Sequence, residues 1–160
     1  REMARKGIFR AGTETPSTLP SHTTPERYAR TVERLRNAWE LDVPITFSTD
    51  ADYYVPGKTR GEVAIEFIET WKDAGIPPAD ILRAMTITGY RASETLDTRG
   101  PIRPGLVADL IAVRGNPLEE IDALRDVRFV LKDGMVYKRD GVITPGAFLH
   151  GGPVNGWGIR

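Results

Sequence analysis

Apolar positions along the chain follow two patterns in turn, helical spacing and short buried runs. Within residues 24–40 the apolar side chains recur every three or four positions, which indicates one face of a helix. Residues 43–50 instead form a β-branched and aromatic run with a proline at its entry, which is typical of a buried strand. Up to residue 97, the two patterns predict strands at 8–9 and 43–50 and helices at 24–40, 60–74, 81–85 and 90–96. This alternation is that of a parallel α/β unit.

The pattern changes after residue 100. Residues 107–113 predict a further strand, and Asp133-Gly134 between two short apolar runs is a strong hairpin signal. The last residues are rich in glycine and proline and lack periodicity. We therefore divide the chain into an α/β region, a small antiparallel β region and a tail, with the ranges 1–97, 98–143 and 144–160.

Composition narrows the classes of function. The 22 lysines and arginines balance the 22 aspartates and glutamates, which argues against a strongly basic nucleic-acid surface. No apolar run approaches the roughly 20 residues of a membrane span. The absence of cysteine excludes disulfides, thiolate metal ligands and a cysteine nucleophile, but it leaves the compartment undetermined.

The first residues resemble the end of a helix more than the start of a protein. Residues 1–6 carry basic side chains near the end of a helical turn, and Gly7 suits a C-cap. We expect the chain to be the rear part of a longer polypeptide. The alternatives are a processed N-terminus or an arbitrary boundary.

Asp50 is the leading candidate for chemistry. It ends the predicted strand 43–50, and in a parallel α/β barrel the carboxyl ends of the strands carry the catalytic groups. A carboxylate in this place can bind a metal ion, accept a proton, or do both.

Five motifs, in order, carry a resemblance to a known family. They are Ser48-Thr49-Asp50 and the segments 80–86, 100–110, 114–121 and 130–134. This series closely resembles the C-terminal part of the amidohydrolase superfamily, with the imidazolonepropionase-like and prolidase-like branch most similar. The resemblance implies the last strands and helices of a (β/α)8 TIM-type barrel plus part of a small β-sandwich, a fold that is incomplete in this chain alone. Residues 8–9 and 43–50 would be barrel strands seven and eight, and residues 106–138 would contribute sandwich strands.

The resemblance also implies a mechanism and a cofactor. Asp50 would ligate a divalent metal, one or two ions and zinc by preference, and would accept the proton of the attacking water. The reaction would be hydrolysis of an amide, peptide-like or cyclic-amide C–N bond in a small-molecule substrate.

The remaining ligands are missing from this sequence. A barrel of this type needs about 250 residues, and the only histidines, His22 and His150, match no ligand position of the family. One carboxylate cannot hold a catalytic zinc, which has three protein ligands as a rule. We therefore expect an N-terminal segment or chain of the same enzyme to carry the histidines, and we expect the complete enzyme to form a homo-oligomer.

Other residues have weaker cases. Tyr53 and Tyr54 follow Asp50 and are candidates for substrate contact. Asp52 is more simply interpreted as a solvated charge on the loop. Lys58 and Arg60 could hold a substrate carboxylate, although a solvated pair at a helix start is the simpler interpretation. Two alternative functions stay open: a non-catalytic binding or assembly module derived from such an enzyme, and a hydrolase of esters, lactones or phosphotriesters.

Overall fold

We describe the protein from a computed structural model, which covers residues 1–19, 24–50 and 54–144. Its elements, in chain order, are α1 (Glu2–Lys6), β1 (Arg10–Gly12), α2 (Pro25–Glu40), β2 (Ile45–Phe47), α3 (Arg60–Glu66), α4 (Ile68–Asp73), α5 (Pro78–Met85), α6 (Ile87–Ala92), β3 (Leu110–Val113), the 3-10 helix η1 (Ile121–Arg125), β4 (Val127–Lys132), β5 (Met135–Arg139) and β6 (Val142–Ile143). The mixed α/β class expected from the sequence is confirmed.

Strands β1 and β2 form a parallel pair in which Arg10, Ala11 and Gly12 lie opposite Ile45, Thr46 and Phe47. The pairing extends beyond β2, because the Ser48 N–H donates to the Gly12 carbonyl at 2.9 Å. The prediction of a strand at 8–9 is wrong by two residues. Gly7 caps α1 in the left-handed conformation with φ 63°, and the Ile8 N–H donates to the Met3 carbonyl at 2.9 Å. Gly7 and Ile8 therefore belong to the end of the helix, and the strand begins only at Arg10.

Helix α2 begins where the sequence predicts. The Thr24 hydroxyl accepts a hydrogen bond from the Arg27 N–H, and Pro25 occupies the first helical position. The prediction of one helix over 60–74 is only partly right, because the helix is interrupted at Phe67, whose N–H donates to the Ala64 carbonyl three residues back. Phe67 is 1% exposed, so the interruption accompanies burial of a large side chain.

The helix predicted at 90–96 lies instead at 87–92. Gly89 is inside this helix and does not break it. The preceding residue explains the shift, since Thr88 on the first turn is buried, and α6 packs against β2. Tertiary contact therefore outweighs the low helix propensity of glycine at this position.

The second region is a four-stranded antiparallel sheet in the order β3-β4-β5-β6. The hairpin at Asp133-Gly134 is confirmed, with φ values of 52° and 76° at the two turn residues. Strand β3 starts at Leu110, three residues later than predicted. The later start has a local cause, because the Val107 N–H donates to the Thr98 carbonyl rather than to a neighbouring strand. Apart from Thr144, the predicted tail lies outside the described residues.

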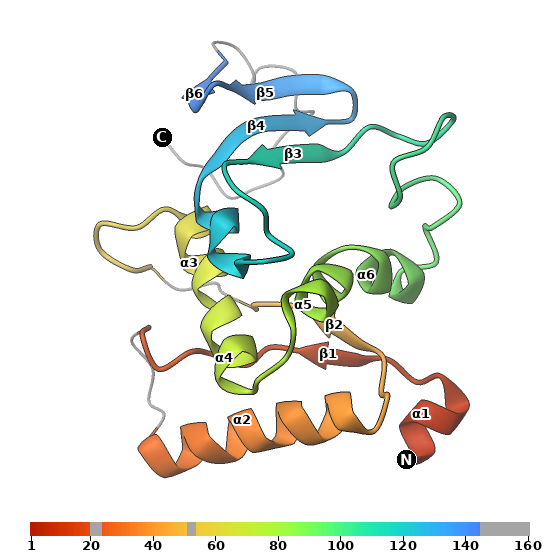
Figure 1. Ribbon diagram of the computed structural model, residues 1–160, viewed down its shortest axis with the longest axis vertical. Coiled ribbons are helices and arrows are strands. Elements are labelled where there is room, and N and C mark those ends of the chain that lie inside the picture. The colour runs from red at the N-terminus through yellow and green to blue at the C-terminus, as the bar shows by residue number, and fades with distance from the viewer. Residues whose placement is uncertain (20–23, 51–53, 145–160) are drawn as a thin grey trace.

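Figure 1 shows the antiparallel sheet at one end of the molecule and α2 at the other, with α3 to α6 and η1 between them. The main core unites α2, β2, α4 and α5, and it also receives Ile121 and Leu124 from η1. Among the described helices, none is long and apolar enough to cross a membrane. A closed barrel, a second sandwich sheet and the three-part domain division remain predictions, since the described residues hold one parallel pair and one antiparallel sheet.

Candidate functional site

Asp50 follows β2 at the carboxyl end of the parallel pair. Thr46 and Ser48 lead toward it along one face of the strand, with 3.4 Å between their hydroxyl oxygens. Thr46 is buried, Ser48 is half-buried, and Asp50 itself is exposed. The predicted strand 43–50 is shorter in the structure, because its partner β1 ends at Gly12 opposite Phe47 and Asp50 follows β2 by three residues. The catalytic role of Asp50 remains a prediction.

The backbone turns sharply at Asp50, which has φ 47° in the left-handed region. Aspartate is among the few residues besides glycine that adopt this region readily. No hydrogen bond or ion pair engages its carboxylate within residues 1–19, 24–50 and 54–144. The Asp50 oxygens are therefore available to a ligand as far as the described chain is concerned.

A partly buried ion pair lies beside the neighbouring strand end. Arg10 of β1 pairs with Glu14, whose side chain is 5% exposed, and the Glu14 carbonyl accepts a hydrogen bond from Thr70 at 3.1 Å. Arg10 Nη1 and Glu14 Oε2 are buried and find no partner in the described structure. These two residues line a polar cavity of about 370 Å³ together with Arg27 and Arg34 of α2.

Sequence reasoning missed Glu14 and Arg10. Glu14 sits in a Thr- and Pro-rich stretch that has no periodicity, and nothing in the local pattern distinguishes a buried carboxylate from a solvated one. The nearest signal is Gly12, because a side chain there would stand 2.9 Å from Glu14 Oε2.

The other predicted contact residues are scattered. Tyr54 is 81% exposed and lies on the loop after β2, while Tyr53 and Asp52 fall outside the described residues. Lys58 donates to Glu66 at 2.9 Å, so its charge is already paired within the chain. Arg60 is the first residue of α3. The two histidines, His22 and His150, also lie outside the described residues.

The described ranges bring no three metal-ligating side chains together. This observation leaves untested the expectation that the chain supplies a single ligand. It does not test the zinc prediction or the number of ions.

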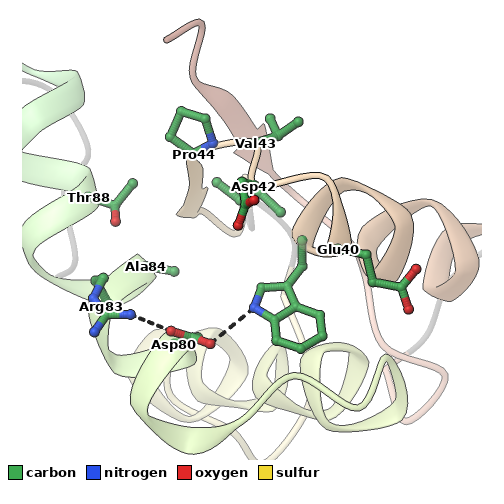
Figure 2. A pocket seen from close by; sticks show the side chains of 10 residues that line it. Glu40, Asp42, Val43, Pro44, Asp80, Arg83, Ala84 and Thr88 are labelled. Atoms are coloured by element: carbon green, nitrogen blue, oxygen red, sulfur yellow. Dashed lines mark hydrogen bonds and ion pairs between the residues drawn. The ribbon is translucent and has the colours of Figure 1, made fainter. Parts of the chain in front are cut away.

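Another cavity, of about 520 Å³, lies at the other end of β2 (Figure 2). It is lined by Asp42, Val43 and Pro44 at the entry to the strand and by Asp80 and Ala84 of α5. The Asp80 carboxylate forms an ion pair with Arg83, seen in Figure 2, and accepts a hydrogen bond from the Trp39 indole at 3.1 Å. Because Asp80 is already satisfied and Asp50 is remote, this cavity is not the candidate site.

Comparisons with known proteins place these features in a family. A model of the amidohydrolase family matches residues 5–139. A search of the curated proteins gave no match.

Solved structures agree with that family match. The chain is similar to a Xaa-Pro dipeptidase crystallised with methionine in its active site, with 32% identity over 69% of this chain and a TM-score of 0.61. It shares its fold with a prolidase complexed with N-methylphosphonate-L-proline, at 21% identity over 86% of this chain and a TM-score of 0.55. It also shares its fold with A. niger ochratoxinase, at 24% identity over 87% of this chain and a TM-score of 0.60.

The chain spans 26% of the dipeptidase chain, 36% of the prolidase chain and 34% of the ochratoxinase chain. The expected resemblance is confirmed, in its prolidase-like branch. On the match over residues 5–139 and the identity to the dipeptidase, this chain belongs to the amidohydrolase family.

Proposed function

We propose that this chain is the C-terminal portion of a metal-dependent amidohydrolase in which Asp50 is a metal ligand and the proton acceptor. The observation that carries the proposal is the position of Asp50, exposed at the carboxyl end of a parallel strand inside the segment that matches the family. The carboxyl ends of parallel strands are where the active sites of α/β barrels are built.

The donor chemistry fits one ligand of a divalent ion. Carboxylate oxygens ligate Zn²⁺ at about 2.0–2.2 Å, and the Asp50 carboxylate is not engaged by the described chain. We propose zinc, as one or two ions, with the other ligands from histidines that an N-terminal segment or chain of the same enzyme supplies. When bound, such an ion supplies a water that is acidic enough to ionise near neutral pH.

Asp50 then has two tasks in the proposed reaction. The Asp50 carboxylate would help to hold the ion and would accept the proton that the attacking water releases. The proton passes to the nitrogen of the leaving group, which departs as a neutral amine. Proton transfer of this kind contributes about 10²- to 10⁴-fold to the rate.

The dipeptidase relative supports a substrate with a peptide-like C–N bond. We propose a small dipeptide or a related N-acyl compound, held in part by Tyr53 and Tyr54, which follow Asp50 in the sequence. The exposed phenol of Tyr54 leaves its ring free to cover a ligand. We further propose that an N-terminal segment or chain of the same enzyme completes the site and that the complete enzyme is a homo-oligomer.

The test replaces Asp50 by Asn in the complete enzyme and follows the hydrolysis of a panel of Xaa-Pro dipeptides. We expect kcat/KM to fall by about 10²-fold or more, because the amide can accept no proton at this position. Metal content, measured by elemental analysis, should fall or become easier to remove with a chelator.

Asp42→Asn is a matched control. Asp42 is likewise exposed and left-handed, with φ 55°, but it lies before β2 at the opposite end of the strand. Its variant should retain wild-type turnover within about two-fold. Wild-type turnover in Asp50→Asn would show that Asp50 has no catalytic role.

A further inference from the structure

The carboxylate of Glu66, the last residue of α3, receives hydrogen bonds from three separate parts of the chain. Thr18, on the loop after β1, donates to Oε2 at 3.2 Å. Lys58, on the loop after β2, donates to Oε1 at 2.9 Å, and Arg125 of η1 donates to the same oxygen at 3.2 Å. One side chain therefore contacts both loops that leave the carboxyl ends of the parallel strands.

A small apolar cluster also brings together the loops after β1 and β2. It combines Leu19 from the first loop and Val55 from the second with Val63 and Phe67, and Phe47 of β2 packs against it. Leu19 and Val55 are 3% and 8% exposed. Each loop thus places one apolar residue in this cluster and one polar donor on Glu66.

Arg125 extends these contacts toward the antiparallel sheet. Besides Glu66 it pairs with Glu69 of α4 and with Asp122 of η1, and Lys72 also bonds to Asp122. Strand β4 begins two residues after Arg125. The Glu66 carboxylate is consequently linked through one guanidinium to the start of the sheet.

Glu66 suits this role electrostatically. Its side chain is 16% exposed, so its ion pairs are less screened by water than those of a fully exposed carboxylate. The hydrogen bond from Lys58 lowers the pKa of Glu66 below its ordinary value, against the opposing effect of burial, and Arg125 lowers it further. Glu66 is therefore ionised at neutral pH.

We propose that Glu66 is a positioning residue that holds the loops after β1 and β2 in one arrangement at the face that carries Asp50. The inference rests on the proposed function, because loop order at this face matters for catalysis only if Asp50 works there. Glu66 itself touches no reacting group. It acts through Thr18 and Lys58, and the rigidity of these loops reduces the entropy lost when substrate binds.

The experiment compares the complete enzyme with its Glu66→Gln variant by hydrogen–deuterium exchange. Glutamine keeps the size and an acceptor oxygen but loses the charge that attracts Lys58 and Arg125. We expect exchange to accelerate about ten-fold in peptides covering 13–19 and 54–59 together. On a dipeptide substrate, we expect KM to rise about ten-fold while kcat stays within about three-fold, because binding rather than chemistry is affected.

Glu62→Gln is the matched control, since Glu62 lies on the same helix and is exposed. It completes a capping box with Thr59, a role that glutamine also fills. This variant should change neither exchange nor KM. Equal effects of the two variants, or acceleration in only one loop of Glu66→Gln, would overturn the inference.

Lys58→Gln provides a second test if Glu66→Gln does not fold. It should accelerate exchange in 54–59 and leave 13–19 as in the wild type, and acceleration in neither loop would contradict the inference. Exchange needs no turnover, so the two proposals fail separately. Wild-type activity in Asp50→Asn would overturn the proposed function, whereas unchanged loop exchange in Glu66→Gln would overturn the role of Glu66.

Discussion

At the residue scale, Gly12 is the position with the least room near the candidate site. A methyl group on its Cα would stand 2.9 Å from Glu14 Oε2, 3.0 Å from the Thr46 carbonyl and 3.2 Å from Ile45 Cγ2. Two of these neighbours belong to β2, so the missing side chain allows the parallel strands to approach. The glycine is required for space, since its φ lies outside the left-handed region.

We therefore predict that Gly12→Ala lowers the free energy of unfolding by about 1–3 kcal/mol, because the added methyl must displace backbone or the buried Glu14 carboxylate. Urea denaturation followed by tryptophan fluorescence measures the change. Gly89→Ala is the control, since nothing lies within 4 Å of a Cβ at that position inside α6. Alanine there should be neutral or stabilising by up to about 1 kcal/mol, and equal losses in both variants would contradict the steric argument.

Residues differ in how far their surroundings can be predicted. Asp50 was identified because it ends the strand 43–50 that the local pattern predicts. Glu14 was not, because the hydrogen bond that its carbonyl accepts comes from Thr70, 56 residues away. A carboxylate in a polar stretch looks the same in sequence whether it is buried or solvated.

At the element scale, Asp109 connects the segment before β3 to the hairpin between β4 and β5. Its carboxylate accepts the Asp133 N–H at 2.8 Å and the Lys132 ammonium at 2.9 Å, and it also pairs with Arg99. These groups surround the β4–β5 turn. The side chain before β3 thereby stabilises the turn between the next two strands.

Asp109 should also make the stability of the sheet dependent on pH. Burial acts to raise its pKa, but the hydrogen bonds from Asp133, Lys132 and Arg99 prevail and lower the pKa from 3.8 to about 2. A carboxyl group with a lowered pKa stabilises the folded state fully at pH values above its unfolded pKa. This contribution is lost as pH falls from about 4 through 2.

We predict that Asp109→Asn lowers the free energy of unfolding by about 1–2 kcal/mol at pH 7, through the loss of charge-assisted hydrogen bonds. The difference from wild type should shrink as pH approaches 2, where the wild-type carboxylate becomes protonated. Urea titrations at pH 7, 4 and 2.5 would measure it. The exposed Asp97→Asn serves as control, and a difference that stays constant over this range would argue against the ionised role of Asp109.

At the scale of the whole molecule, the two regions share a core. Ile121 of η1, which precedes the sheet strand β4, is 2% exposed and packs with residues of α2, α4 and α5. The sheet and the helices are therefore expected to unfold together.

Ile121→Ala tests this cooperativity. We predict a loss of about 2–4 kcal/mol, because truncation leaves a cavity in the common core. Fluorescence of Trp39 and Trp71 should report the same transition as far-UV circular dichroism. Ile111→Ala on the sheet is the control, since Ile111 is 56% exposed and should cost less than about 1 kcal/mol. Separate transitions would show that the two regions fold independently.

The sequence by itself determined the features that depend on neighbours a few positions away. These include the Thr24 cap of α2, the Gly7 helix end, the Asp133-Gly134 hairpin and the motif order that indicated the family. Each follows from backbone preferences or from hydrogen bonds within one turn, so local residue types suffice to predict it.

Only the tertiary structure decided which polar side chains meet. Glu66 joins Thr18, 48 residues before it, to Arg125, 59 residues after it, and the Glu14 carbonyl accepts a hydrogen bond from Thr70 of α4, 56 residues after it. The break at Phe67 and the helical Gly89 likewise follow from packing against distant elements. Such contacts depend on how elements far apart in sequence pack together in space. The local sequence pattern does not determine this packing.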